Sequence, residues 1–373
     1  MKITRAFSLA LGFIVLGGVD SSFGQGALTP PGSPAPTMKT LDQLEARTPI
    51  TSLPFVIGSP GSYYFTGNLV GTAGTNGITV LTDGVSIDLN GFALIGKQGS
   101  SNGVFMAASV RTLSVRNGTV KSWGRAGIEA VNASNCQFTD LRVDSNGGIG
   151  IDSGNGAITT KCSAISNGGI GISGGNGSVI KDCTAQSNAG AGINGYFGCT
   201  ITGCAAQSNT GVGISASSGN TIKDCSAMSN TGGGISTAGS CTINGCSVYN
   251  NTGIGIATGF SLVEDCTVNG NSGEGIYLST SGTLLHNTVY NNGGFVSSNS
   301  NIHVIGSYNR LEGNHSNNGY SGIRVDSAGN VIIRNSAGGN NTNYFIATGN
   351  LAGPQLGSAG VSSNTNPDSN FSY

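Results

Sequence analysis

Four side chains that could carry acid–base chemistry follow one another at similar intervals in the second half of the chain. They are Asp265, His286, Glu312 and Arg334. A carboxylate beside an imidazole, with a second carboxylate and a guanidinium in reach, could transfer protons on an acidic sugar. The same residues could instead form a ladder of complementary salt bridges. The pattern leaves a catalytic and a purely structural interpretation open.

A second set, formed by Tyr277, His303 and Arg324, has similar spacing and a different chemistry. Aromatic faces stack on sugar rings, and a guanidinium pairs with carboxylates. These residues are therefore our candidate substrate-binding patch for a sugar. The alternative is that the less regular C-terminal part of the chain simply carries larger side chains under longer loops.

Both sets owe their spacing to a unit of about 21 residues that repeats between residues 150 and 295. Each unit begins with the glycine of a Gly-Ile pair, which we number position 1. The second set then occupies position 3, and the first set is expected at position 12. A fixed period of this size is typical of a solenoid, in which each unit buries its apolar face against its neighbours. Short apolar runs within the unit predict three strands per coil, and the chain length predicts about eleven coils.

Three sets of positions are expected to face inward. Isoleucine fills position 2, and position 10 is Ile180, Ile201, Ile222, Ile243, Val263 and Leu285. Position 13 is Cys162, Cys183, Cys204, Cys225, Cys246 and Cys266. Coils about 4.8 Å apart would allow disulfides between these cysteines. Since cysteine is also a good small core residue, we favour a reduced, buried stack.

Position 18 is asparagine in every unit from Asn146 to Asn292. Asparagine tolerates a left-handed backbone and bonds within its own turn, so this column predicts a tight corner in each coil. With its inward aliphatic columns and its asparagine column, the chain resembles the right-handed parallel β-helices of the pectin-lyase-like superfamily. The resemblance covers roughly residues 60 to 350 and implies an all-β solenoid.

The superfamily's known catalytic patterns do not occur in this sequence. Its pectate lyases use clustered aspartates for calcium, and its polygalacturonases use paired aspartates with a Gly-His-Gly. Here the three histidines lie in Leu-His286-Asn, Ile-His303-Val and Asn-His315-Ser. Asp182, Asp224 and Asp265 would be two coils, about 10 Å, apart, which is too far to share one calcium ion. We expect no metal and no cofactor, and no catalytic residue transfers from these relatives.

The chain ends differ in composition from the repeat. Lys2 and Arg5 precede an apolar run from Ala6 to Val19, which predicts a signal peptide over residues 1–24. Residues 25–60 are expected to form a proline-rich linker and an N-terminal cap, with a short helix at 41–46 covering the open end of the first coil. The β-helix domain is expected over 61–350 and a C-terminal tail over 351–373. No later stretch is expected to span a membrane.

The expected signal peptide and the net charge limit the classes of function that the sequence supports. A signal peptide implies a secreted protein, with the periplasm or the cell surface as possible destinations. A net charge of −1 provides no basic field for nucleic acid. We favour a non-catalytic module that binds polysaccharide or a cell-surface glycan along an extended groove. The alternative is a lyase, epimerase or hydrolase acting on an acidic polysaccharide such as pectin or alginate.

Overall fold

The computed structural model describes residues 45–107, 109–294, 299–357 and 365–373. The expected signal peptide, most of the proline-rich segment and nearly all of the helix expected at 41–46 lie outside these residues. Every regular element in the described part of the chain is a β-strand. Within it, no helix is long and apolar enough to cross a membrane.

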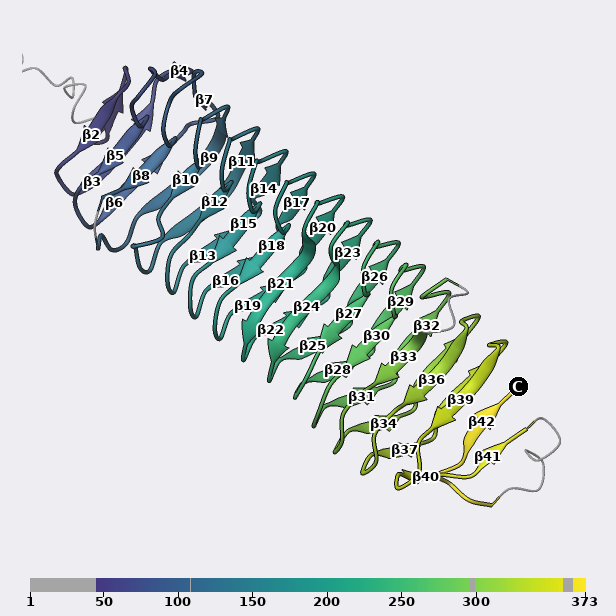
Figure 1. Cartoon of the computed structure of the whole chain (residues 1–373). Helices are drawn as coiled ribbons and strands as arrows, with labels where there is room; N and C mark the ends of the chain where they lie inside the picture. The colour runs from purple at the N-terminus through teal and green to yellow at the C-terminus, as the bar shows by residue number, and fades with distance from the viewer. Residues whose placement is uncertain (1–44, 108, 295–298, 358–364) are drawn as a thin grey trace, which may run out of the picture. The chain divides into compact units, whose positions relative to one another are not determined.

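Each coil of the repeat contains three short strands, as the sequence predicts. In one coil these are β15 (Ile172–Gly174), β16 (Val179–Lys181) and β17 (Thr184–Gln186). Each pairs in parallel with the strand one repeat later, in the order β18 (Ile193–Gly195), β19 (Thr200–Thr202) and β20 (Ala205–Gln207). The coils therefore stack on one another as a parallel β-helix (Figure 1).

The first strands of the coils form one parallel sheet of 14 strands, so the described chain has more coils than the eleven expected. Besides β15 and β18, it contains β2 (Phe55–Ile57), β5 (Ile78–Val80), β8 (Val104–Met106), β10 (Ile128–Glu129), β12 (Ile151–Asp152), β21 (Val212–Ser218), β24 (Gly233–Gly239), β27 (Ile256–Thr258), β30 (Ile276–Leu278), β33 (Ser300–Val304), β36 (Ser321–Val325) and β39 (Thr342–Ile346). The number of coils expected from the sequence was too small because the coils at both ends are not spaced by 21 residues.

The second and third strands of the coils join in a sheet of 28 strands, because β9 and β11 run through both positions. Its N-terminal members are β1 (Thr48–Ile50), β3 (Gly61–Phe65), β4 (Leu69–Val70), β6 (Val85–Asp88), β7 (Ala93–Ile95), β9 (Ser114–Lys121), β11 (Gln137–Asp144), β13 (Ile158–Thr160) and β14 (Ser163–Ile165). After β20 come β22 (Thr221–Lys223), β23 (Ser226–Met228), β25 (Thr242–Asn244), β26 (Ser247–Tyr249), β28 (Leu262–Glu264), β29 (Thr267–Asn269), β31 (Thr283–Leu285), β32 (Thr288–Tyr290), β34 (Arg310–Glu312), β35 (His315–Asn317), β37 (Val331–Ile333) and β38 (Ser336–Gly338). The last are β40 (Leu351–Ala352), β41 (Gln355–Leu356) and β42 (Asn370–Ser372).

The C-terminal tail continues this architecture. Strand β42 pairs with β38 of the last full coil. The Asn370 side chain is fully buried and accepts hydrogen bonds from the backbone and the side chain of Asn335. The described end of the chain therefore covers part of the final coil.

The asparagines of position 18 differ from their predicted role. They are buried, and the left-handed residue is the one before each of them, such as Ser187 with φ 55°. The Asn188 amide nitrogen donates to Oδ1 of Asn209 in the next coil at 3.0 Å and to the Ala164 carbonyl at 3.0 Å. These asparagines thus satisfy backbone groups at the inner side of the corner, where water does not reach.

The core follows the predicted columns, with one correction at position 10. Leu284 is the buried residue, and Leu285 lies half-buried one position later. All nine cysteines are free and buried. The thiol of Cys183 donates to backbone carbonyls, and hydrogen bonding with Cys162 together with burial raises the pKa of Cys183 to about 12. After Cys266 the same column continues as asparagine, beginning with Asn287, whose Oδ1 accepts from the Cys266 backbone N–H.

Candidate functional site

The three residues of the predicted sugar-binding patch lie side by side. The register pairs Tyr277 with His303 and His303 with Arg324 on successive strands of the 14-stranded sheet. Phe345 of β39 extends this row by one further coil. The rings of Tyr277 and His303 meet edge to face, with centroids 5.5 Å apart. The predicted position-3 register is therefore confirmed at the C-terminal end.

The imidazole of His303 is held between two carboxylates. Its Nδ1 lies 3.2 Å from Oε1 of Glu274, and its Nε2 lies 2.9 Å from Oδ2 of Asp326. Burial alone would lower the pKa of His303, but the two carboxylates outweigh it and raise that pKa above its ordinary value. The hydrogen bond from His303 in turn holds the pKa of Glu274 below its usual value. Both ring nitrogens are thus already engaged in an ion-paired network.

Arg324 is the member of the row that remains available to a ligand. Its Nε donates to Oδ1 of Asp326 at 2.8 Å, and its guanidinium carbon lies 5.5 Å from the centroid of Phe345. Among the described residues, nothing accepts a hydrogen bond from its two terminal nitrogens. A hollow of about 160 Å³ lies beside it, lined also by Tyr320 and Thr342. We call the group Tyr277, His303, Arg324 and Phe345 the arginine row.

The predicted acid–base set at position 12 does not form one site. Strand pairing aligns Glu312 with Leu285, and it is Gly313 that follows His286 at this position. Position 12 is a left-handed corner, with φ near 53° at Asp265 and His286 and 67° at Gly313. The longer segment between β32 and β34 shifts the register by one residue, which the expected alignment did not include.

The four residues separate into two pairs instead. Nδ1 of His286 lies 3.9 Å from Oδ1 of Asp265, and both side chains are mostly exposed. Glu312 accepts hydrogen bonds from Arg310 and Arg334, each at 2.6 Å. Arg310 first, and Arg334 second, hold the pKa of Glu312 below its usual value. Arg334 also pairs with Asp368 of the C-terminal tail at 3.0 Å. This arrangement matches the salt-bridge interpretation of Glu312 and Arg334.

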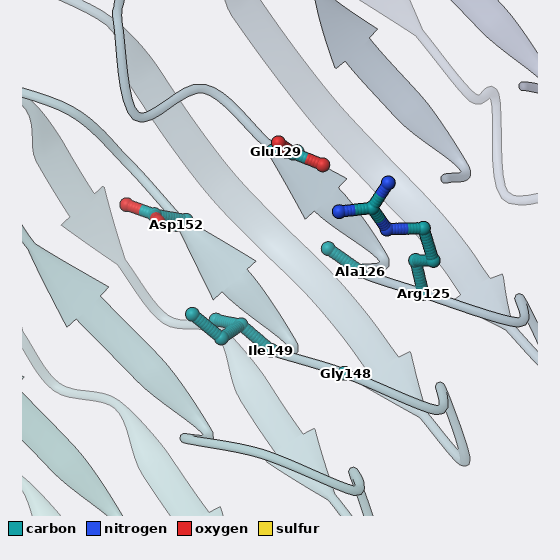
Figure 2. Close-up of a pocket in the computed structure, with 6 residues that line it drawn as sticks. All are labelled: Arg125, Ala126, Glu129, Gly148, Ile149 and Asp152. Atoms are coloured by element: carbon teal, nitrogen blue, oxygen red, sulfur yellow. The ribbon is translucent and has the colours of Figure 1, made fainter. Parts of the chain in front are cut away.

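Sequence reasoning did not select a charged hollow near the other end of the 14-stranded sheet. Glu129 of β10 pairs directly with Asp152 of β12, so two carboxylates occupy position 3 on neighbouring strands. They line a hollow of about 250 Å³ together with Arg125, Ala126, Gly148 and Ile149 (Figure 2). No ion pair joins Arg125 to either carboxylate in the described chain. The signal was visible in the sequence, because position 3 carries consecutive carboxylates only here.

The environment of Asp152 disfavours its negative charge. Burial raises its pKa to about 6, the neighbouring charge of Glu129 adds to the rise, and a backbone hydrogen bond from Gly154 partly opposes it. Like charges on adjacent strands destabilise a sheet, so this pair has no evident structural benefit. In the described residues, no group of three or more His, Cys, Asp or Glu side chains could hold a metal ion.

The sequence and the structure were compared with those of known proteins. No curated protein matches the sequence. Among solved structures, the catalytic domain of a GH87 α-1,3-glucanase in complex with tetrasaccharides has 15% identity and a TM-score of 0.50, covering 66% of this chain and 59% of that one. The A-module of mannuronan C-5 epimerase AlgE6 from Azotobacter vinelandii has 13% identity and a TM-score of 0.49, covering 87% and 89%. Dettilon tailspike protein has 12% identity and a TM-score of 0.38, covering 87% and 60%.

The similarity to the glucanase domain concerns the fold alone, which is a right-handed parallel β-helix. A family model described as a right-handed β-helix region matches residues 102–242 and 195–309. Together the two matches extend over more than half of the sequence. The chain therefore belongs to the right-handed β-helix family.

Proposed function

We propose that this protein is secreted and binds an acidic polysaccharide on the outer face of its 14-stranded sheet, with the arginine row as the main contact. The observation that carries the proposal is the set of contacts made by the Arg324 guanidinium. Asp326 fixes the guanidinium through Nε, the Phe345 ring lies against it, and its terminal nitrogens have no acceptor among the described residues. A guanidinium held in this way offers two parallel donors to a carboxylate.

The same cluster favours binding over catalysis. A general base needs a ring nitrogen free to take a proton from the substrate. Both nitrogens of His303 instead contact carboxylates, and the side chain is largely buried. His303 therefore acts in this proposal as a support that holds Asp326, and through it Arg324, in place. The exposed Phe345 ring and the adjacent hollow provide a surface for the face of a sugar ring.

The N-terminal sequence supports export, because Lys2 and Arg5 precede an apolar run of signal-peptide length. The proposal does not require turnover of the polymer.

Calorimetric titration of the mature protein with oligogalacturonate and oligoalginate, and with dextran as a neutral polymer, tests the proposal. We expect an acidic oligomer to bind and Arg324→Gln to weaken that binding about tenfold to a hundredfold, because a hydrogen bond to a charged group contributes about 1.5–3 kcal/mol. Arg310→Gln is the matched control, since Arg310 is an exposed arginine of the other sheet. Equal affinity of Arg324→Gln and the unaltered protein would refute the proposal. Release of unsaturated products during the titration would establish a lyase instead.

A further inference from the structure

Asp152 lies between two hollows of the 14-stranded sheet. The first, of about 250 Å³, lies before β10 and β12 and includes Arg125 and Glu129. The second, of about 230 Å³, lies beyond the ends of β12, β15 and β18 and includes Asn155, Asn176 and Tyr196. Each is smaller than a typical ligand pocket of roughly 300–1,000 Å³, and together they fall within that range. Because they share Asp152, a single ligand could occupy both by crossing the sheet along the strand direction.

The second hollow contains hydrogen-bond donors that the fold leaves unused. Oδ1 of Asn155 accepts from the Asn176 backbone N–H at 2.9 Å, and Oδ1 of Asn176 accepts from the Phe197 backbone N–H at 3.2 Å. These bonds fix the orientation of both amides. Among the described residues, neither amide nitrogen has an acceptor, so both remain available to a ligand.

An aromatic ring and two carboxylates add further contacts that a sugar could make in the two hollows. Tyr196 is 49% exposed, which leaves its ring free to contact the apolar face of a sugar. Glu129 and Asp152 offer carboxylate oxygens to hydroxyl donors. Arg125 offsets only one of these two charges, so the hollow stays negative overall, which disfavours a ligand that carries carboxylates of its own.

We infer that the two hollows form one binding site for an uncharged disaccharide unit, which crosses the 14-stranded sheet over Asp152. Hydroxyl groups on one ring donate to Glu129 and Asp152, and the second ring stacks on Tyr196 and accepts from the amides of Asn155 and Asn176. This site differs from the proposed arginine row in its position on the sheet and in the charge of the ligand that it would bind. Asp152 on β12 and Arg324 on β36 lie eight strands apart in the 14-stranded sheet.

Calorimetric titration of the full chain with cellotetraose, laminaritetraose and maltotetraose tests the inference, and trigalacturonate serves as the anionic probe. We expect at least one neutral oligosaccharide to bind. Tyr196→Ala should weaken that binding about tenfold, since an aromatic contact contributes up to about 1.5 kcal/mol beyond its buried area. Asn176→Asp, which replaces an amide donor by a carboxylate of the same shape, should weaken it as well. Phe260→Ala is the matched control, because Phe260 is an exposed aromatic residue at a later coil.

The inference is overturned if none of the three neutral oligosaccharides binds, if Tyr196→Ala binds as tightly as the unaltered protein, or if trigalacturonate displaces the neutral ligand. Failure of this site and failure of the arginine row are distinguishable. Arg324→Gln should leave the affinity for the neutral oligosaccharide unchanged, and Tyr196→Ala should leave the affinity for the acidic oligomer unchanged.

Discussion

The Nε2 atom of His303 lies 2.9 Å from Oδ2 of Asp326, the residue directly after β36, which is the next strand of the 14-stranded sheet. Glu274 contacts the other ring nitrogen at 3.2 Å. An imidazole can donate from both nitrogens only when it is protonated. The contacts therefore stabilise the positive form of His303, and this largely buried side chain joins Glu274, Asp326 and Arg324 in one network.

His303→Gln should reduce stability in a way that depends on pH. Because the folded-state pKa of His303 is raised, its contribution to stability is fully present below the unfolded value of about 6.5 and is lost as pH rises through the folded value. Urea denaturation should show a larger difference between the two proteins at pH 6 than at pH 9. His315→Gln serves as the histidine control. An equal difference at both pH values would contradict the network.

Asp152→Asn, unlike His303→Gln, should increase stability at neutral pH. A carboxyl whose pKa rises from 3.8 to about 6 on folding favours the folded state below pH 4, and this contribution is lost as pH rises to about 6. At pH 7 the variant should be more stable by at most about 3 kcal/mol, reduced by the partial exposure of the group.

Thermal or urea unfolding at pH 4 and pH 7 measures this difference. Asp182→Asn is the control, since Asp182 is an exposed carboxylate at a corner position where asparagine is tolerated. Its effect should stay within about 0.5 kcal/mol. A variant at Asp152 that is less stable at pH 7 would show that its charge is stabilised by the fold.

Asn209→Ala should destabilise the β-helix strongly. Oδ1 of Asn209 accepts from the backbone and the side chain of Asn188, and its amide nitrogen donates to Asn230 and to the Ala185 carbonyl. Truncation leaves several buried polar groups unpaired, at about 1–3 kcal/mol each. We expect a loss of about 3 kcal/mol or more in urea unfolding. Asn194→Ala, on the outer face of the sheet, should change stability by less than about 0.5 kcal/mol. Similar losses for both variants would show that the ladder has no special role.

The sequence predicted that three of the four members of the arginine row share position 3, because the repeat period continues through them; Phe345 was not among the predicted residues. Tyr277, His303 and Arg324 follow isoleucines of the position-2 column, and each inward isoleucine fixes the outward direction of the next residue. The period could not reveal Glu274 and Asp326, since neither belongs to position 3. Their contacts with His303 depend on how the corners turn beside the strands.

The prediction for Glu312 failed for a backbone reason. Position 12 requires a left-handed residue, and the insertion between β32 and β34 places Gly313 there instead. The same requirement explains the glycines at Gly203 and Gly245, with φ 64° and 65°. The charges of the side chains at position 12 do not show that the backbone there must be left-handed. The position of the asparagines was misjudged in the same way, because they adjoin a left-handed residue but do not adopt that conformation themselves.

His286→Gly separates the conformational from the chemical role of position 12. His286 has φ 53°, its side chain is 60% exposed, and its one ion pair, with Asp265, is 3.9 Å long. An exposed pair of this kind contributes at most about 1 kcal/mol, whereas a left-handed backbone costs a non-glycine residue about 1–2 kcal/mol. The variant should therefore be as stable as the unaltered protein or more stable by up to about 1 kcal/mol in urea unfolding. His286→Val, which introduces a β-branched side chain at the same φ, should be less stable than both. A marked loss of stability in His286→Gly would show that the pair with Asp265 outweighs the backbone strain, and loss of any polysaccharide turnover in a fully folded variant would assign His286 a chemical role.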